Sequence, residues 1–318
     1  MGRVCHKMVA FIFPGQGSQY VGMGKDLYEA FPESKTVFDT ADKVLGFPLT
    51  KLCLEGPLEE LTRTKNCQPA ILTVSIAALE AFKSSIHYPA SSIKYTAGLS
   101  LGEYAALVVA GVIGFEEALR LVSKRAQLME EETHTYPGKM AAVLGLERKV
   151  VEDICAQAGA QIANLNCPGQ IVISGKTEAV EKAKASLLAS GAKRVIDLEV
   201  SGAFHSSLMK EAAAKFKVFL DSFTLKKASI PIISNVSASP TQDAAVIREN
   251  LFRQIYSAVL WEDTVRFMAG EGVKLLYEIG PGSVLKGLIR KIDASLEVKN
   301  IGNAQEVYKC VRRSKIHC

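Results

Sequence analysis

The sequence lacks closely spaced pairs of cysteines, and this absence argues against a fold held together by disulfides or by a bound zinc ion. Its seven cysteines are odd in number and widely scattered along the chain. None is spaced as C-x-x-C, so the pattern indicates neither a disulfide framework nor a zinc site. We therefore expect no bound metal and a reducing compartment.

The chain also lacks a long apolar run and a large excess of charge of either sign. The apolar run at 8–13 stops at Pro14 and Gly15, which is too short for a signal sequence or a membrane span. The 38 basic and 33 acidic residues leave a net charge of +5, which argues against a dedicated nucleic-acid surface but permits an acidic partner. We expect no membrane and no nucleic acid. The expected location is cytoplasmic, or a plastid or mitochondrion if a transit peptide has been removed.

What the sequence does have is the composition of an ordinary globular protein. Of its 318 residues, 48% are hydrophobic and 22% are charged. Strand-like apolar runs alternate with helix-length segments. The expected strands are 8–13, 93–97, 230–234 and 274–279, and the expected helices are 69–82, 103–111, 115–131, 244–254 and 261–270. This alternation predicts an α/β core around a parallel sheet.

The pattern changes in the middle of the chain. Strands are predicted at 140–146, 161–164, 170–174 and 193–200, and helices at 149–158 and 178–190. The order β-α-β-β-α-β is typical of a ferredoxin-like unit inserted into a larger domain. We expect a large subdomain of residues 1–133 and 201–318 and a small subdomain of residues 134–200, with 134–138 as a linker.

A candidate nucleophile, Ser100, lies in Gly98-Leu99-Ser100-Leu101-Gly102, the pattern G-x-S-x-G, between an expected strand and an expected helix. A serine on such a sharp turn presents its hydroxyl, and the flanking glycines remove side chains that would clash. The context favours a nucleophile, with a glycine-rich helix N-terminus as the alternative.

A serine nucleophile needs a base, and histidine is the usual one. Four of the five histidines lie before the first strand, in a loop, in the expected linker or at the tail: His6, His87, His134 and His317. His205 remains, between an expected strand end and a helix start, where loops at a sheet edge present catalytic groups. The residues alone leave a catalytic and a structural histidine equally open.

Acyl transfer also needs hydrogen-bond donors for an oxyanion, and the N–H group after the nucleophile is a common one. Here it belongs to Leu101. A second donor could come from the turn at 14–19, which contains Gln16, although a plain structural turn is the alternative. The glycine spacing of this turn matches neither a P-loop nor a dinucleotide fingerprint.

Arg125 shares a helix face with apolar residues rather than with other charges. These neighbours are Leu121, Val122, Leu128 and Met129. A buried guanidinium at this position would bind a carboxylate through two parallel hydrogen bonds. The residues alone favour the other interpretation, in which the side chain extends to solvent.

Several short motifs occur together along the chain. They are FPGQGSQ at 13–19, GLSLGEY at 98–104, Arg125, NCPGQ at 166–170, AFHS at 203–206, SNV at 234–236, RQ at 253–254 and EIGPG at 278–282. With these motifs the chain resembles the malonyl-CoA:acyl-carrier-protein transacylases from about residue 8 to residue 302. The resemblance implies an α/β-hydrolase-like large subdomain with a parallel sheet and an inserted ferredoxin-like small subdomain.

The resemblance also implies a mechanism. Ser100 would take malonyl from coenzyme A as an ester and pass it to the phosphopantetheine thiol of acyl carrier protein, with His205 as general base and acid. Arg125 would bind the malonyl carboxylate. Gln16 and the N–H group of Leu101 would form the oxyanion hole.

The resemblance implies roles for three further residues. Gln254 would orient His205, Asn166 would line the substrate site, and Phe204 matches the malonyl-selecting form of its motif. The partners implied are acyl carrier protein and a coenzyme A thioester, with no cofactor beyond the substrate malonyl-CoA. We expect a monomer that supplies fatty acid synthesis.

One letter departs from the family pattern, because many bacterial members have histidine where this chain has Leu99. Plant-type and mitochondrial relatives are apolar there, so Leu99 places the chain nearer that branch. The alternatives are a serine hydrolase or thioesterase acting on acyl-CoA, a noncatalytic carrier-binding module, and an acyltransferase that serves polyketide synthesis. Arg125 disfavours the hydrolase. The basic tail 305–318 is expected to be a solvated terminus.

Overall fold

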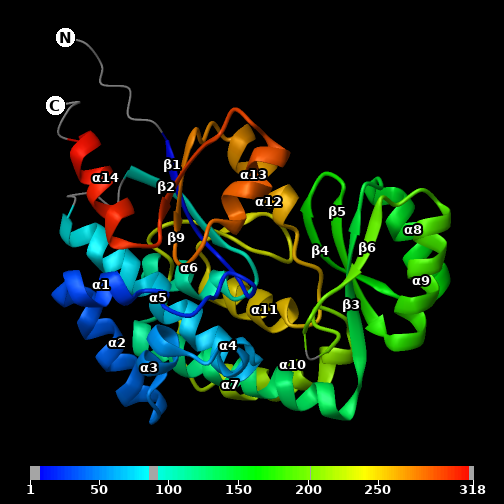
Figure 1. The fold of residues 1–318 in the computed structure, drawn as a ribbon, viewed down its shortest axis with the longest axis horizontal. Coiled ribbons are helices and arrows are strands. Elements are labelled where there is room, and N and C mark those ends of the chain that lie inside the picture. The colour runs from blue at the N-terminus through cyan, green and yellow to red at the C-terminus, as the bar shows by residue number, and fades with distance from the viewer. Residues whose placement is uncertain (1–7, 86–91, 201, 315–318) are drawn as a thin grey trace.

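Two sheets of unequal size carry the fold in a computed structural model of the chain (Figure 1). The structure describes residues 8–85, 92–200 and 202–314. The larger sheet has six strands and the smaller sheet four, and they lie in separate lobes. His6, His87 and His317, which the sequence analysis set aside as bases, fall outside the described residues.

The larger sheet has the strand order β10-β9-β1-β2-β7-β8, and its edge strand β8 is antiparallel to β7. Its strands are β1 (Val9–Phe13), β2 (Ile93–Gly98), β7 (Ile232–Ile233), β8 (Pro240–Thr241), β9 (Leu275–Ile279) and β10 (Glu297–Ile301). Every residue of β1 and β9 is buried, because parallel strands in the middle of a sheet are covered on both faces. The predicted α/β class is confirmed.

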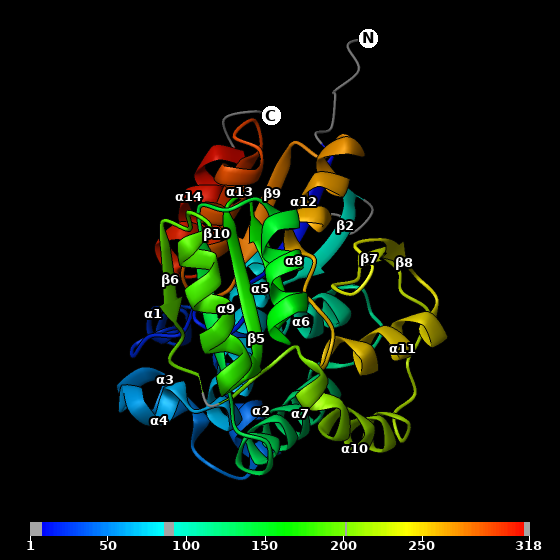
Figure 2. The same ribbon diagram turned by 90° about the vertical axis from the view of Figure 1, so that its right-hand side faces the viewer.

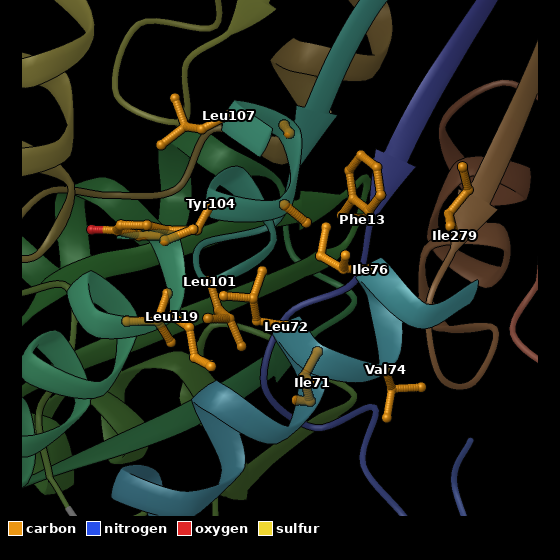
Figure 3. Packing of buried hydrophobic residues seen from close by; sticks show 14 of the residues in the cluster. Phe13, Ile71, Leu72, Val74, Ile76, Leu101, Tyr104, Leu107, Leu119 and Ile279 are labelled. Carbon is orange, nitrogen blue, oxygen red and sulfur yellow. The ribbon is translucent and has the colours of Figure 1, made fainter. Parts of the chain in front are cut away.

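Helices cover both faces of this sheet, and the side chains of β1 alternate between them. Phe11 and Phe13 pack on one side, where Figure 3 shows Phe13 beside Ile76. The helices in that cluster include α2 (Pro32–Leu45), α5 (Thr64–Ser85), α6 (Gly102–Val109) and α7 (Phe115–Thr135). Ala10 and Ile12 pack on the other side, against α12 (Trp261–Gly270) and α13 (Val284–Ile292). The core of the larger lobe is therefore divided by its sheet.

Further helices surround this core. They are α1 (Lys25–Ala30), α3 (Leu49–Glu55), α4 (Leu58–Thr62), α10 (Lys210–Leu220), α11 (Ala244–Gln254), α14 (Ala304–Ser314) and a short 3₁₀ turn at Ser207–Met209. The bounds of α11 and α12 are the same as those predicted from the sequence. The strand predicted at 230–234 is shorter, since β7 has two residues.

The smaller sheet has the order β4-β5-β3-β6 and is antiparallel. Its elements follow the predicted β-α-β-β-α-β order: β3 (Gly138–Leu144), α8 (Arg148–Ala158), β4 (Gln161–Cys167), β5 (Gln170–Lys176), α9 (Thr177–Ala189) and β6 (Arg194–Asp197). Helices α8 and α9 cover one face (Figure 2). Met140 and Val172 on the other face pack with the core of the larger lobe. All of these elements lie inside the predicted insertion 134–200, whose boundaries stay a prediction.

Several further segments differ from expectation. The linker expected at 134–138 begins later, because α7 continues to Thr135 with Glu132 and Thr133 buried. Strand β10 is not predicted, since this edge strand is mostly half-buried and has no continuous apolar run. The tail that is expected to be solvated from residue 305 is helical as far as residue 314, as part of α14, and its Lys309 is exposed. Val307 of this helix is buried in the core, and the ring of Tyr308 lies 5.4 Å from that of Phe31.

Candidate active site

Ser100 lies at the turn between β2 and α6, where the parallel strands end. Its φ angle of 51° is in the left-handed region, which costs a non-glycine residue about 1–3 kcal/mol and persists only where the surroundings enforce it. The flanking glycines allow this. A Cβ atom on Gly98 would overlap the backbone of Gly102, and one on Gly102 would overlap the carbonyl group of Phe13. The tight turn directs the serine side chain away from the sheet and into a cavity.

His205 is hydrogen-bonded to Ser100. Its Nε2 lies 2.8 Å from Ser100 Oγ, and its Nδ1 lies 2.8 Å from the main-chain carbonyl oxygen of Gln254. Because a carbonyl oxygen only accepts, Nδ1 carries the proton and Nε2 is left to accept from the serine hydroxyl. Burial and then the charge of Arg125 lower the pKa of His205 to about 4. At neutral pH the imidazole is therefore neutral, as a general base requires.

Arg125 is fully buried, and its guanidinium donates hydrogen bonds to neutral groups. Nη1 donates to Gln68 Oε1 at 2.6 Å, and Nη2 donates to Ser100 Oγ at 2.9 Å and to Gln254 Oε1 at 3.0 Å. The interpretation that this side chain extends to solvent is wrong, because α7 packs that face against α5. Burial lowers the pKa of the guanidinium. No carboxylate in the described part of the chain forms an ion pair with it, so the geometry suits an anionic ligand.

Gln254 uses its main chain and its side chain for different purposes. The resemblance implies that it orients His205, and its main-chain carbonyl is placed to do so. Its side chain lies elsewhere: Nε2 donates to the main-chain oxygen of Ser100 at 3.0 Å and to Glu103 Oε2 at 2.7 Å. The amide thus connects the guanidinium of Arg125 to a buried carboxylate.

Three residues to which the sequence analysis assigns no role complete these contacts. They are Gln68, Glu103 and Asn235. Asn235 Oδ1 accepts a hydrogen bond from the N–H group of Ser100 at 2.6 Å, and its Nδ2 donates to the main chain of the same turn at 2.6 Å. Glu103 and Asn235 lie inside the quoted motifs, and Gln68 is a polar side chain immediately before the apolar helical run 69–82. That position is the signal that could have identified it.

A cavity of about 350 Å³ lies between the two lobes. It brings together all the predicted site residues except Gln254: Gln16, Ser100, Leu101, Arg125, Asn166, Phe204 and His205. Met140 and Val172 of the smaller sheet form part of its apolar wall. Among its described lining residues, Arg125 is the one Lys or Arg side chain. Apolar walls with a few convergent polar groups are typical of a small-molecule site.

The two groups that the resemblance implies as oxyanion donors lie near Ser100. The N–H group of Leu101 has no acceptor among the described residues. Gln16 lies on the turn after β1, and this turn is packed against the serine: a Cβ atom on Gly15 would be 2.5 Å from the carbonyl oxygen of Leu99. Both groups line the cavity beside the serine.

Within 8–85, 92–200 and 202–314, no group of three or more His, Cys, Asp or Glu side chains could hold a metal ion. Over the same ranges, no helix combines the length and apolar character needed to cross a membrane.

Comparison with known proteins gives the family. The model of the acyl transferase domain matches residues 10–310. This chain belongs to the acyl transferase family. The match spans both lobes, so neither lobe of this acyl transferase is an addition to the family fold.

Curated relatives cover most of this acyl transferase. The malonyl CoA-acyl carrier protein transacylase of Bacillus subtilis is 48% identical over 312 residues, which are 96% of this chain and 97% of the relative. The malonyl CoA-acyl carrier protein transacylase of Escherichia coli K12 is 43% identical over 287 residues, 89% of this chain and 92% of the relative. Both organisms are bacteria, and the branch that Leu99 predicts stays a prediction.

Solved structures confirm the fold. The acyl-carrier-protein-S-malonyltransferase of Bartonella henselae has a TM-score of 0.93 and 40% identity, covering 96% of this chain and 98% of its own. A malonyl-transacylase solved in complex with a type II PKS acyl-carrier protein has a TM-score of 0.90 and 39% identity, covering 96% and 99%. The resemblance that the motifs predict is therefore confirmed over nearly the whole chain.

Proposed function

We propose that this acyl transferase moves malonyl from malonyl-CoA to the phosphopantetheine thiol of acyl carrier protein through an ester on Ser100. The observation that carries the proposal is the position of Arg125. Its buried guanidinium donates to the nucleophile's Oγ at 2.9 Å and has only neutral hydrogen-bond partners. An acyl group bound at Ser100 and ending in a carboxylate would supply the missing negative charge.

The first half-reaction follows from the hydrogen bonds of the resting site. His205 Nε2 takes the hydroxyl proton as Ser100 Oγ attacks the thioester carbonyl. The carbonyl oxygen becomes an oxyanion, for which the N–H group of Leu101 and the side chain of Gln16 are the proposed donors. The C–S bond then breaks, His205 returns the proton to the departing sulfur, and free coenzyme A leaves a malonyl ester behind.

The second half-reaction runs the same steps with a different thiol. His205 deprotonates the phosphopantetheine thiol, whose sulfur attacks the ester carbonyl. The C–O bond breaks, and the proton returns to Ser100 Oγ. Arg125 holds the malonyl carboxylate throughout, so the acyl carbon stays beside the nucleophile. No cofactor enters this scheme, and fatty acid synthesis is the pathway we propose for the product.

Asn166 and Phe204 are proposed as substrate contacts from the cavity wall. Both line the space beside Ser100 and His205. Phe204 is buried directly before the base, where a large apolar ring limits the room for branched acyl groups. The amide of Asn166 offers a donor and an acceptor to the rest of the substrate.

Mass spectrometry of the protein after treatment with malonyl-CoA tests the proposal. We expect a malonyl adduct on the peptide that contains Ser100 and no adduct on the Ser100→Ala variant. Adding acyl carrier protein should remove the adduct and yield malonyl carrier. Rapid release of free malonate that does not depend on the carrier would support the hydrolase instead, because hydrolysis requires water to attack the ester.

A further inference from the structure

Glu103 is a buried carboxylate close to the proposed site, but no step of the mechanism uses it. It lies three residues after Ser100 on the first turn of α6 and is 2% exposed. Burial of an ionisable carboxyl group is costly unless its oxygens accept hydrogen bonds. The hydrogen-bond partners of Glu103 therefore indicate which groups this buried carboxylate holds in position.

The hydrogen bonds of Glu103 lead to the two groups that malonyl transfer needs. Its Oε2 accepts from Gln254 Nε2 at 2.7 Å and from the main-chain N–H group of Asn235 at 3.2 Å. The other end of the Gln254 amide accepts from Arg125 at 3.0 Å. The side chain of Asn235 accepts from the N–H group of Ser100 at 2.6 Å. One carboxylate is thus joined to the guanidinium through one residue and to the nucleophile's turn through another.

The chemistry of this connection is directional. An ionised carboxylate only accepts hydrogen bonds, so the amide of Gln254 must present its NH₂ group to Glu103. Its carbonyl oxygen must then face Arg125, and this is the orientation that the two hydrogen bonds require. A neutral group at position 103 would hold the amide less strongly, because hydrogen bonds to charged groups are the stronger ones.

We propose that Glu103 is a positioning residue that sets the preference of this enzyme for a carboxylated acyl group. It acts through Gln254, which holds the Arg125 guanidinium in the place where the malonyl carboxylate binds. The inference rests on the proposed function, because it assumes that Arg125 binds that carboxylate. Glu103 does not touch the substrate or the reacting atoms.

The surroundings of Glu103 make this role sensitive to pH. Burial raises the pKa of its carboxyl group to about 7, against the opposing effects of Gln254, Asn235, Arg125 and the Ser234 hydroxyl. Among the described residues, the one charged group that acts on it is the guanidinium of Arg125 on α7, and burial together with the charge of Glu103 in turn raises the pKa of the neighbouring Tyr104 phenol on α6. The charge of Glu103 is therefore lost as the pH falls through about 7. A protonated Glu103 then resembles a glutamine.

The test compares malonyl with acetyl transfer in Glu103→Gln and Glu103→Ala variants. The measured quantity is the ratio of kcat/KM for malonyl-CoA to kcat/KM for acetyl-CoA. We expect a fall of about threefold in Glu103→Gln, which keeps an acceptor oxygen, and of about tenfold in Glu103→Ala, which does not. Glu116→Gln is the matched control, since Glu116 is an exposed carboxylate on α7, and its ratio should equal that of the wild type.

A double variant separates positioning from a purely structural role. If Glu103 acts through Arg125, adding Glu103→Gln to Arg125→Ala should not lower the malonyl-to-acetyl ratio further. A structural role would instead lower kcat/KM for both acyl groups equally, in Glu103→Gln alone and again when it is added to Arg125→Ala, and it would leave the malonyl-to-acetyl ratio of Glu103→Gln at the wild-type value. Thermal unfolding of each variant is recorded alongside, and Glu103→Gln carries the test if Glu103→Ala does not fold.

The pH profile provides an independent readout. In the wild type the malonyl-to-acetyl ratio should fall below about pH 7 toward the value of Glu103→Gln, whereas the ratio of that variant should stay flat. An unchanged or higher ratio in Glu103→Gln would overturn the inference. Failure of the wild type to form a malonyl ester on Ser100 would overturn the proposed function, so the two failures are distinguishable.

Discussion

The two walls of the cavity are built in different ways. The larger lobe supplies the proposed reactive groups, since Gln16 and Ser100 follow the carboxyl ends of β1 and β2, and Arg125 projects from α7, which packs against α5 and α6. The smaller lobe supplies a wall of apolar side chains, among them Met140 and Val172, and of the uncharged amides Asn164, Asn166 and Gln170. A parallel sheet gathers its loops at one edge, where polar groups can converge. An antiparallel sheet covered on one side by helices offers the alternate side chains of its other face.

The two lobes also differ in where their charged side chains lie. The larger lobe buries Glu103 and Arg125 in one hydrogen-bonded group with no direct ion pair between them. The smaller lobe keeps its ion pairs near the surface, where Lys184 Nζ lies 2.6 Å from Asp197 Oδ1 and Lys139 Nζ lies 2.7 Å from Glu181 Oε1. Electrostatic interactions between buried charges are strong because the protein interior has a low dielectric constant, whereas solvent screens the ion pairs at the surface. Substitutions in the larger lobe should therefore affect activity far more than loss of a surface charge in the smaller lobe.

Removing the proposed nucleophile should have the largest effect. Ser100→Ala should lower malonyl transfer by at least about 10³-fold, because no covalent intermediate can form. Steady-state transfer to acyl carrier protein measures this. Ser207→Ala, an exposed serine near His205, is the control and should retain wild-type activity. Full transfer by Ser100→Ala would support the noncatalytic carrier-binding alternative.

Removing the buried cation should affect one substrate more than another. Arg125→Ala should lower malonyl transfer by about 100-fold, since a charge-assisted contact with the carboxylate is lost. Acetyl transfer should be spared, because an acetyl group has no carboxylate. Competition between malonyl-CoA and acetyl-CoA measures the difference, with Arg120→Ala on the exposed side of α7 as the control. Equal losses for the two acyl groups would contradict the proposed role.

The low pKa of His205 predicts a broad acidic range of activity. Below its pKa the imidazole is protonated and cannot act as a base, so the loss of acetyl transfer should begin near pH 4. An unshifted histidine with a pKa of about 6.5 would already reduce kcat/KM about tenfold at pH 5.5. Measuring kcat/KM for acetyl-CoA between pH 5 and pH 8 distinguishes these cases. An acidic limb centred near 6.5 would show that burial does not control this histidine.

The smallest effect is expected on the outer surface of the smaller lobe. Lys184→Met removes the ammonium group but keeps an apolar stem, so it should cost at most about 1 kcal/mol of unfolding free energy. Denaturant unfolding measures this change, and kcat for malonyl transfer should be unchanged. A large loss of activity would mean that the charges of the smaller lobe contribute to catalysis, contrary to the comparison drawn above.

Much of the framework could be predicted because local patterns carry it. The helices α11 and α12 have the predicted bounds, and the elements of the smaller sheet occur in the predicted order. A turn pattern and the elimination of the other histidines point to Ser100 and His205, and Ser100 Oγ lies 2.8 Å from His205 Nε2. Helical periodicity could not decide whether Arg125 is buried, because it identifies a face of a helix but not what covers that face.

The amino-acid sequence by itself determined the α/β class, the inserted unit and the sharp turn at Ser100, because side-chain periodicity and glycine act over a few residues. Only the tertiary structure places the main-chain carbonyl of Gln254 against His205 Nδ1 and its side-chain oxygen against Arg125. It also brought Glu103 and Arg125 into one buried group. Hydrogen-bond partners far apart in the chain depend on packing, and burial sets the pKa of each group they include.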